Sequence, residues 1–207
     1  MSERLWILLN GDFALADRLP FSDEPIIAVD GGIRHAQHLM QSPNLWLGDF
    51  DSATIDYPHI ARETYPSDKD YTDFELALAY AHEHYSQRDW HIMGSAGDEA
   101  DHSFGNLWTL PKFGRRCFLW QKNALIFFGK DQIQLSWQAA LHSKVSIFAL
   151  TPLEKLSNSG LKWTLNDSVL SPYCALAARN EMIEEKASVS WQKGCGLVFL
   201  PPTVTLL

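Results

Sequence analysis

The sequence predicts an α/β fold in which a mainly parallel, Rossmann-like sheet with helices is followed by a smaller antiparallel β-sandwich or barrel domain. From residue 1 to about 120, short apolar runs alternate with helical patterns, as in parallel βαβ units. After about residue 123, strand-like runs follow one another without long helices between them. A chain of 207 residues can hold one core or two, and this change of pattern favours two domains, 1–122 and 123–207.

The first strand is expected at Leu5–Leu9, an apolar run that meets Asn10-Gly11-Asp12 at once and is too short for the core of a signal peptide. No later segment is long and apolar enough to predict a membrane span. The other strands expected in this half are Ile26–Val29, Leu45–Leu47, Arg62–Tyr65, His91–Met93 and Cys117–Trp120.

The clearest helix is predicted over Asp73–Tyr85, where apolar residues recur at helical spacing and fall on one face. Thr72 and Glu75 form a possible capping box at its start, since a Thr with a Glu three positions later can satisfy the first free N–H groups of a helix. Asp70 and Asp73 are therefore expected at or beside a helix N-terminus.

The second half contains short strand-like runs only, which predicts the antiparallel domain. These runs are Ala124–Phe128, Gln132–Leu135, Val145–Ala149, Leu161–Leu165, Ser188–Trp191 and Leu197–Leu200.

The charge and the cysteine content of the sequence exclude some classes of function. Seventeen Lys and Arg against 25 Asp and Glu give a formal charge of −8, and the longest basic cluster is Arg115-Arg116, so nucleic acid is not an expected partner. The three cysteines, Cys117, Cys174 and Cys195, predict neither a disulfide framework nor a zinc site. They fit a reduced cytoplasm best.

Acidic side chains follow several predicted strands of the first half. Because parallel strands end at one edge of a sheet, these loops are expected to lie near a common ligand site. Each motif alone is more often a turn or a helix cap. Together they offer the hard oxygen ligands that Mg²⁺ requires. The motifs are Asp30-Gly31-Gly32, Gly48-Asp49-Phe50-Asp51-Ser52, Lys69-Asp70-Tyr71-Thr72-Asp73 and Asp101-His102.

Such a site suits phosphoryl transfer, in which a metal ion neutralises phosphate charge and the protein positions the reactants. The sequence has no GxxxxGK[ST] loop and no protein-kinase motif set, so a different nucleotide-binding solution is needed.

In their order and spacing, these four motifs resemble the thiamine pyrophosphokinase family. The resemblance continues in the second half at Ser159-Gly160-Leu161-Lys162-Trp163-Thr164-Leu165, so it covers most of the chain. It implies an ATP- and Mg²⁺-binding catalytic domain over 1–122, a thiamine-binding domain over 123–207, and a homodimer whose thiamine sites lie between domains of two subunits. The implied reaction transfers the diphosphate of ATP to the hydroxyl of thiamine and releases AMP.

The resemblance also implies roles for individual residues. Asp49, Asp51 and Asp73 would be the catalytic residues that hold Mg²⁺, and Asp73 would also accept the thiamine hydroxyl proton. Trp163 would stack on the thiamine ring, which suits attraction between a cation and an aromatic face, with Asn180 nearby. The residues implied on the ATP side are Asp30, Gly31, Gly32, Lys69, Asp70, Thr72, Asp101 and His102.

Glu99 departs from the family pattern, because the family has Arg at this position of the loop before Asp101-His102. We expect weaker ATP binding, or compensation by another cation such as Lys69 or Arg34. The family's Ser-Asn-Glu segment reads Arg179-Asn180-Glu181 here, which affects the thiamine side.

Two other functions remain open at this point. A diphosphokinase for another heterocyclic alcohol, such as a pterin, would use similar ATP and Mg²⁺ machinery, although the Trp163 segment favours thiamine. A thiamine-binding sensor without catalysis would explain Glu99, whereas the retention of Asp49, Asp51 and Asp73 argues for an enzyme.

Overall fold

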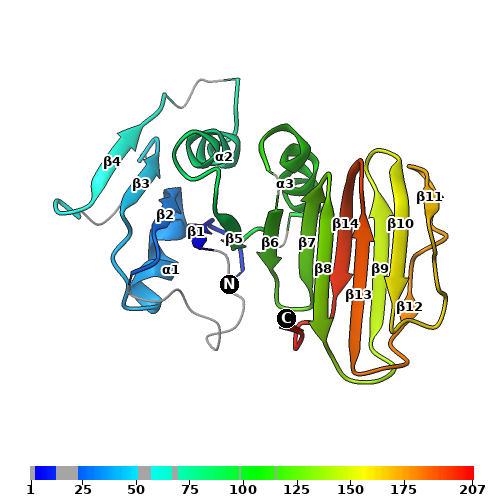
Figure 1. The fold of residues 1–207 in the computed structure, drawn as a ribbon. Coiled ribbons are helices and arrows are strands. Elements are labelled where there is room, and N and C mark those ends of the chain that lie inside the picture. The colour runs from blue at the N-terminus through cyan, green and yellow to red at the C-terminus, as the bar shows by residue number, and fades with distance from the viewer. Residues whose placement is uncertain (1–2, 13–22, 51–56, 67–69, 98, 115) are drawn as a thin grey trace. The chain divides into compact units, whose positions relative to one another are not determined.

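The computed structural model describes residues 3–12, 23–50, 57–66, 70–97, 99–114 and 116–207 (Figure 1). The chain forms two compact units, Met1–Lys122 and Asn123–Leu207. The first contains a parallel sheet with helices and the second contains antiparallel sheets, which confirms the predicted fold class.

The elements of the first unit follow the expected alternation of strands and helices. In chain order they are β1 (Arg4–Leu8), β2 (Ile26–Val29), the 3-10 turn η2 (Asp30–Gly32), α1 (Ile33–His38), β3 (Leu45–Gly48), β4 (Ala61–Thr64), α2 (Asp73–His84), β5 (Asp89–Met93), α3 (Ala100–Phe113) and β6 (Arg116–Trp120).

The sheet of this unit has the strand order β6-β5-β1-β2-β3-β4, and its described pairings are all parallel. Strands β2, β3 and β5 are buried along their whole length, as expected for a parallel sheet covered on both faces. From β1 the chain adds β2, β3 and β4 on one side and then places β5 and β6 on the other. The order of the strands therefore reverses between β1 and β5.

Helices α2 and α3 lie beside one another (Figure 1), and Lys112 of α3 is 3.9 Å from Glu75 of α2. Helix α2 begins where the capping box predicted. Helix α3 was not predicted, although Phe104, Leu107 and Trp108 recur at helical spacing. In the structure Leu110 is the one buried residue of this helix. Pro111 lies in its last turn, where it ends the helix without breaking its middle.

The second unit consists of strands. They are β7 (Leu125–Lys130), β8 (Ile133–Gln138), β9 (Lys144–Ala149), β10 (Leu153–Ser159), β11 (Ser168–Leu170), β12 (Asn180–Glu181), β13 (Lys186–Trp191), β14 (Cys195–Leu200) and β15 (Thr205–Leu206).

Within this unit, β12-β9-β14-β7 and β11-β10-β13-β8-β15 form separate antiparallel sets. Buried residues alternate along β8, β9 and β13, which is the pattern of strands with one face on a core. Phe127, Trp137 and Trp191 are almost fully buried and supply much of its apolar volume.

The strand predicted at Leu161–Leu165 is wrong. The chain forms β10 before this run and β11 after it, and Leu161 makes only an isolated bridge to Met182. Gly160 has φ +72°, a left-handed conformation that ends the strand. The segment 160–167 is therefore a loop that carries Trp163.

Cys117 and Cys195 are buried, Cys174 is partly exposed, and all three are free thiols. Within the described residues, no helix is both long enough and apolar enough to cross a membrane.

Candidate active site

A cavity of about 960 Å³ lies at the carboxyl ends of β1 and β5 in the first unit. Open parallel sheets bind ligands where the strand order reverses, because the loops on either side of that point diverge and leave a crevice. The residues after β1 that line the cavity are 9–12, and those after β5 are 94–97. Its size is within the range of small-molecule sites, roughly 300 to 1,000 Å³.

The loops after β1 and β5 are joined by backbone hydrogen bonds beyond the ends of the strands. Leu9 N donates to Met93 O at 2.8 Å, and Gly11 N donates to Gly94 O at 2.9 Å. Gly94 has φ +72°, and a Cβ there would overlap Leu9 O. Glycine at this position therefore allows the close approach of the loops that shapes one wall of the cavity.

The N-terminus of α2 borders the cavity through Thr72 and Asp73. Thr72 Oγ1 accepts a hydrogen bond from Glu75 N at 3.2 Å, and Thr72 N donates to Glu75 Oε2 at 3.1 Å, which confirms the capping box. This reciprocal cap fixes where the helix begins. Asp73, the first residue of α2, is consequently held at the cavity.

The first turns of α3 form another part of the lining, including Asp101 and His102. Glu99 occupies the N-cap position, and its Oε2 lies 3.2 Å from His102 Nδ1. The ends of α2 and α3 that border the cavity are both N-terminal, where free N–H groups and the helix dipole favour negatively charged ligands.

Asp30 lines the cavity from η2, directly after β2. Its φ is +44°, an uncommon conformation for a residue with a side chain, and its carbonyl oxygen accepts a 2.9 Å hydrogen bond from Trp46 Nε1. A Cβ added at Gly48 would overlap Asp30 Oδ1, so the missing side chain at 48 makes room for the carboxylate. Strained residues of this kind are common at functional sites.

Gly31 and Gly32 support the turn and are not among the residues that line the cavity. A Cβ at Gly31 would overlap Asn10 Oδ1, and one at Gly32 would overlap Leu8 O. The two glycines thus let the turn after β2 lie directly against the end of β1.

Arg34 and His35 hold the loop after β1 from α1. The Arg34 guanidinium donates to Asn10 O, and His35 Nε2 lies 2.9 Å from Gly11 O. Burial lowers the pKa of His35, and the charge of Arg34 acts in the same direction. Arg34 is exposed, and its side chain borders the cavity.

The cavity is strongly acidic. Among its described lining residues, Arg34 is the one Arg or Lys side chain. The carboxylates of the lining belong to Asp12, Asp30, Asp73, Glu99 and Asp101. A polyphosphate would meet a mostly negative surface here unless cations accompanied it.

Some predicted residues are placed elsewhere. Asp49 follows the end of β3 and is partly exposed, and Asp70 is exposed before α2, but neither is among the cavity's lining residues. Asp51 and Lys69 lie outside the described residues. Across the described ranges, no group of three or more His, Cys, Asp or Glu side chains forms a metal site, and the predicted trio includes Asp51.

Several lining residues escaped sequence reasoning. Asn10 and Asp12 directly follow β1, so the rule that strand ends share one edge would have identified them. Ser95 follows β5, and its carbonyl accepts a 2.9 Å hydrogen bond from Asn106 Nδ2. Asn106 was missed because α3 itself was not predicted.

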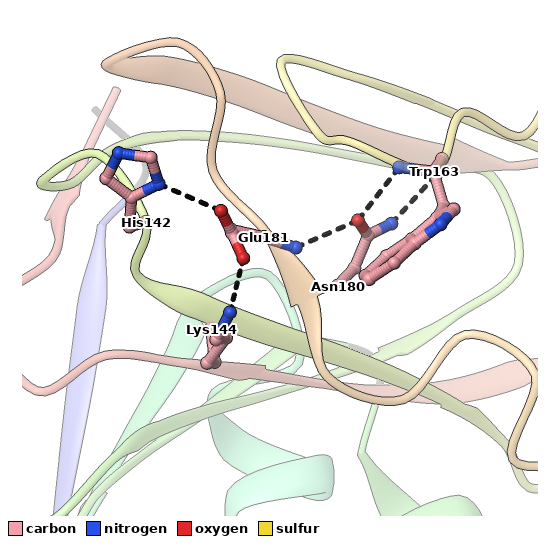
Figure 2. Close-up of polar contacts among 5 residues, drawn as sticks. All are labelled: His142, Lys144, Trp163, Asn180 and Glu181. Atoms are coloured by element: carbon pink, nitrogen blue, oxygen red, sulfur yellow. Dashed lines mark hydrogen bonds and ion pairs between the residues drawn. The ribbon is translucent and has the colours of Figure 1, made fainter.

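The second unit places Trp163 and Asn180 together (Figure 2). Trp163 N donates to Asn180 Oδ1 at 3.0 Å, and Asn180 Nδ2 donates to Trp163 O at 2.8 Å. Asn180 is 3% exposed, whereas Trp163 is 56% exposed. A buried amide therefore holds the backbone of a residue whose ring remains open to solvent.

Glu181 is the next residue of β12, and its side chain contacts β9 and the loop before β9 (Figure 2). Its carboxylate contacts Lys144 Nζ and lies 2.8 Å from His142 Nδ1. The hydrogen bond from Lys144, followed by that from His142, lowers the pKa of Glu181 to about 2. These contacts attach β12 to β9 and to the loop before it.

Comparison with known families gives two matches in sequence. The family model "Thiamin pyrophosphokinase, catalytic domain" matches residues 17–119, and "Thiamin pyrophosphokinase, vitamin B1 binding domain" matches residues 131–196. A thiamine pyrophosphokinase of Bacillus subtilis is 28% identical over 158 residues, which are 71% of this chain and 73% of that protein.

Solved structures give the same result for the fold. A crystal structure of thiamine pyrophosphokinase from Bacillus subtilis superimposes with a TM-score of 0.81 at 24% identity, covering 96% of this chain and 99% of the other. A thiamin pyrophosphokinase family protein from Enterococcus faecalis gives a TM-score of 0.77 at 25% identity, covering 97% and 99% of the two chains.

Proposed function

This chain belongs to the thiamin pyrophosphokinase family, and from that premise we propose that it transfers the diphosphate group of ATP to the hydroxyl of thiamine. The observation that carries the proposal is the cavity at the strand reversal, where the N-termini of two helices and several carboxylates surround a space large enough for a nucleotide. The products are thiamine diphosphate and AMP.

In the proposed reaction the hydroxyl oxygen of thiamine bonds to the β-phosphorus of ATP. The bond from that phosphorus to the oxygen bridging to the α-phosphorus breaks, and AMP leaves with both electrons of that bond. The hydroxyl proton passes to the carboxylate of Asp73. The position of Asp73 at a capped helix start, bordering the cavity, supports this role.

Mg²⁺ is the cofactor we propose, held by Asp73, Asp49 and Asp51. The donor chemistry of Asp73 fits, because it borders the cavity and hard divalent cations prefer carboxylate oxygens, whereas the roles of Asp49 and Asp51 rest on the motif. When bound, Mg²⁺ supplies charge neutralisation on the phosphate groups. The residues of the chain hold the nucleotide and the attacking hydroxyl in position.

On the nucleotide side, Asp30, Thr72, Asp101 and His102 border the cavity and retain their proposed ATP-binding roles. The Gly31 and Gly32 turn would act by shaping the approach of β2 to β1. Roles for Lys69 and Asp70 rest on the motif alone.

On the acceptor side, we propose that the exposed ring of Trp163 stacks on thiamine. The Lys162 ammonium lies 5.1 Å from the centroid of this ring, within the range of a cation–π contact that a bound cation would have to displace or share. Thiamine is a flat heterocycle with a positive charge, which is the class of ligand that such a ring favours.

We also propose that the protein is a cytoplasmic homodimer. Free thiols at Cys117, Cys174 and Cys195 support a reducing compartment. Light scattering on the purified protein tests the dimer, and a mass equal to one chain would contradict it.

The function is tested by incubating the purified chain with ATP and Mg²⁺, with and without thiamine, while AMP and thiamine diphosphate are separated by chromatography. We expect AMP only when thiamine is present and an equal amount of thiamine diphosphate. Thiamine binding without product would instead indicate a sensor. If thiamine neither binds nor reacts, a pterin alcohol is the next acceptor to assay.

A further inference from the structure

We infer that Asn180 is a positioning residue that holds Trp163 in place for an aromatic cation, rather than a residue that contacts the ligand. The inference rests on the proposed function. It changes the role that the sequence suggested for Asn180, and it follows from how the polar atoms of this side chain are used.

Both ends of the Asn180 amide are engaged by the backbone of the chain. Oδ1 accepts hydrogen bonds from Trp163 N at 3.0 Å and Glu181 N at 2.9 Å, and Nδ2 donates to Trp163 O at 2.8 Å. An amide oxygen accepts two hydrogen bonds with its two lone pairs, so the acceptor capacity of Oδ1 is filled. A ligand would have to break these bonds to reach the oxygen, and it would have to enter a site where the side chain is only 3% exposed to reach the second N–H of Nδ2.

The pair of bonds to Trp163 fixes a loop residue at both its N–H and its C=O. The arrangement resembles a short piece of strand pairing made by a side chain (Figure 2). Because Asn180 is 3% exposed, breaking these bonds would leave buried polar groups without partners, which is costly. The backbone of Trp163 is therefore fixed while its ring stays accessible.

Asn158 supports the same loop from β10. Its Nδ2 donates to Trp163 O at 3.3 Å, and its Oδ1 accepts from Leu165 N at 3.3 Å. Asn158 is 8% exposed, so it is also a buried amide that faces the loop. These bonds are longer than those of Asn180, which makes Asn180 the stronger attachment.

The strand that carries Asn180 is itself attached on its other side. Asn180 pairs with Val145 of β9, and the Glu181 carboxylate binds Lys144 and His142. Asn180 thus connects the loop to strand β9 of the second unit. The backbone from which the ring projects therefore loses little freedom when a ligand stacks on the ring, and such preorganisation favours binding.

The test is a double-mutant cycle of Asn180→Ala and Trp163→Ala, with thiamine binding measured by calorimetry and turnover measured in the same preparations. Asn180→Ala should raise the Kd and the KM for thiamine about tenfold, with kcat and the KM for ATP nearly unchanged. In the Trp163→Ala background, Asn180→Ala should have little further effect, because the ring through which it acts is gone.

Ser188→Ala is the matched control. It removes the 2.8 Å hydrogen bond between the hydroxyls of Ser159 and Ser188, on neighbouring strands of the same unit, and leaves the bonds from Asn180 and Asn158 to Trp163 in place. Thiamine binding should not change. Asn158→Ala covers the case in which Asn180→Ala does not fold, and it should weaken thiamine binding in the same direction by a smaller factor.

Effects of Asn180→Ala and Trp163→Ala that multiply fully would overturn the inference, since they would show that Asn180 acts on the ligand directly. Unchanged thiamine binding in Asn180→Ala would overturn it as well. Neither result would affect the proposed activity of the unmodified protein.

A failure of the proposed function is distinguished by a measurement that needs no ligand. Trp163 N–H should exchange slowly with solvent in the unmodified protein and at least tenfold faster in Asn180→Ala. If the unmodified protein does not bind thiamine, the proposed function fails, and this exchange rate alone decides the positioning role. Equal exchange rates would overturn that role.

Discussion

The carboxylate of Asp30 occupies the space that a side chain at Gly48 would need. An added Cβ at position 48 would overlap Asp30 Oδ1. The end of β3 therefore determines where a carboxylate from the end of β2 can lie, and the two neighbouring strands share one part of the candidate nucleotide site.

Gly48→Ala should consequently displace Asp30. We expect a loss of about 1–3 kcal/mol in the free energy of unfolding from overpacking, together with a higher KM for ATP. Urea unfolding and initial-rate kinetics measure the two effects. Gly105→Ala is the control for stability alone, because a Cβ there meets nothing within 4 Å and alanine favours the helix, whereas the residue lines the cavity and its KM for ATP is not compared. Equal stability of Gly48→Ala and the unmodified protein would contradict the steric argument.

Asp73→Asn should lower kcat by about 10²–10⁴, the range that a general base contributes. The fold should persist, because asparagine has nearly the same shape and the Thr72–Glu75 cap does not depend on Asp73. Circular dichroism and the AMP assay test the prediction. Glu83→Gln removes a carboxylate from the same helix outside the site and should retain full turnover. Turnover near normal in Asp73→Asn would remove it from the mechanism.

Glu99→Gln should strengthen ATP binding about two- to fivefold, a modest factor because an exposed charge is screened by water. Glu99 borders the cavity and would repel phosphate groups. The KM for ATP and a direct titration give the factor. Glu99→Arg should act in the same direction and more strongly, whereas no change in either variant would identify Glu99 as a bystander.

Arg34→Gln should weaken ATP binding about tenfold and leave adenosine binding nearly unchanged, if its guanidinium meets phosphate. The comparison matters because Arg34 also donates to Asn10 O, and collapse of that loop would weaken both ligands. Arg34→Lys should retain part of the affinity, and Arg88→Gln is a control for the loss of one positive charge in this unit. Equal losses for ATP and adenosine would show that Arg34 acts on the loop alone.

His91 predicts how stability depends on pH. Burial, followed by the charges of Arg4 and Arg116, lowers its pKa to about 3, and Trp120 Nε1 donates to His91 Nδ1 at 3.0 Å. In the unfolded chain His91 takes up a proton near pH 6.5, whereas in the folded chain it stays neutral until about pH 3. Lowering the pH between these two values therefore favours unfolding.

The stability linked to His91 is therefore fully present above about pH 6.5 and declines by about 5 kcal/mol towards pH 3. In His91→Phe, the free energy of unfolding should fall less steeply over the same window. Chemical denaturation at a series of pH values measures the slope. Parallel curves for the two proteins would mean that other groups dominate the acid response.

Much of the first unit was predictable from local pattern. Buried runs such as Ile26–Val29 and the capping box at Thr72 carry their signals within a few residues. Helix α3 was missed although Phe104, Leu107 and Trp108 recur at helical spacing, and in the structure Phe104 and Trp108 are exposed. Its contribution to the cavity became visible only in the structure, where Asp101, His102 and Asn106 belong to the lining.

The candidate thiamine site could not be predicted from local pattern, because contacts from other parts of the chain shape it. The run Leu161–Leu165 has the composition of a strand, but the bonds that make it a loop come from Asn158 and Asn180. Asn180 is distant in sequence, and nothing near Trp163 indicates which of its atoms will be bound. The sequence predicted that Trp163 and Asn180 belong to one site. It did not indicate that Trp163 would offer its ring whereas Asn180 would hold the backbone of Trp163.

The acidic lining of the cavity should affect the rate at which a nucleotide associates with the protein. The described lining carries five carboxylates and one guanidinium, so the approach of a tetra-anion such as metal-free ATP would be slowed. Added salt screens such repulsion, and the association rate of the bare nucleotide should rise with ionic strength. A nucleotide that is already bound to a divalent ion would carry less negative charge and associate faster. We therefore expect the nucleotide and the ion to form their complex in solution before they bind the protein.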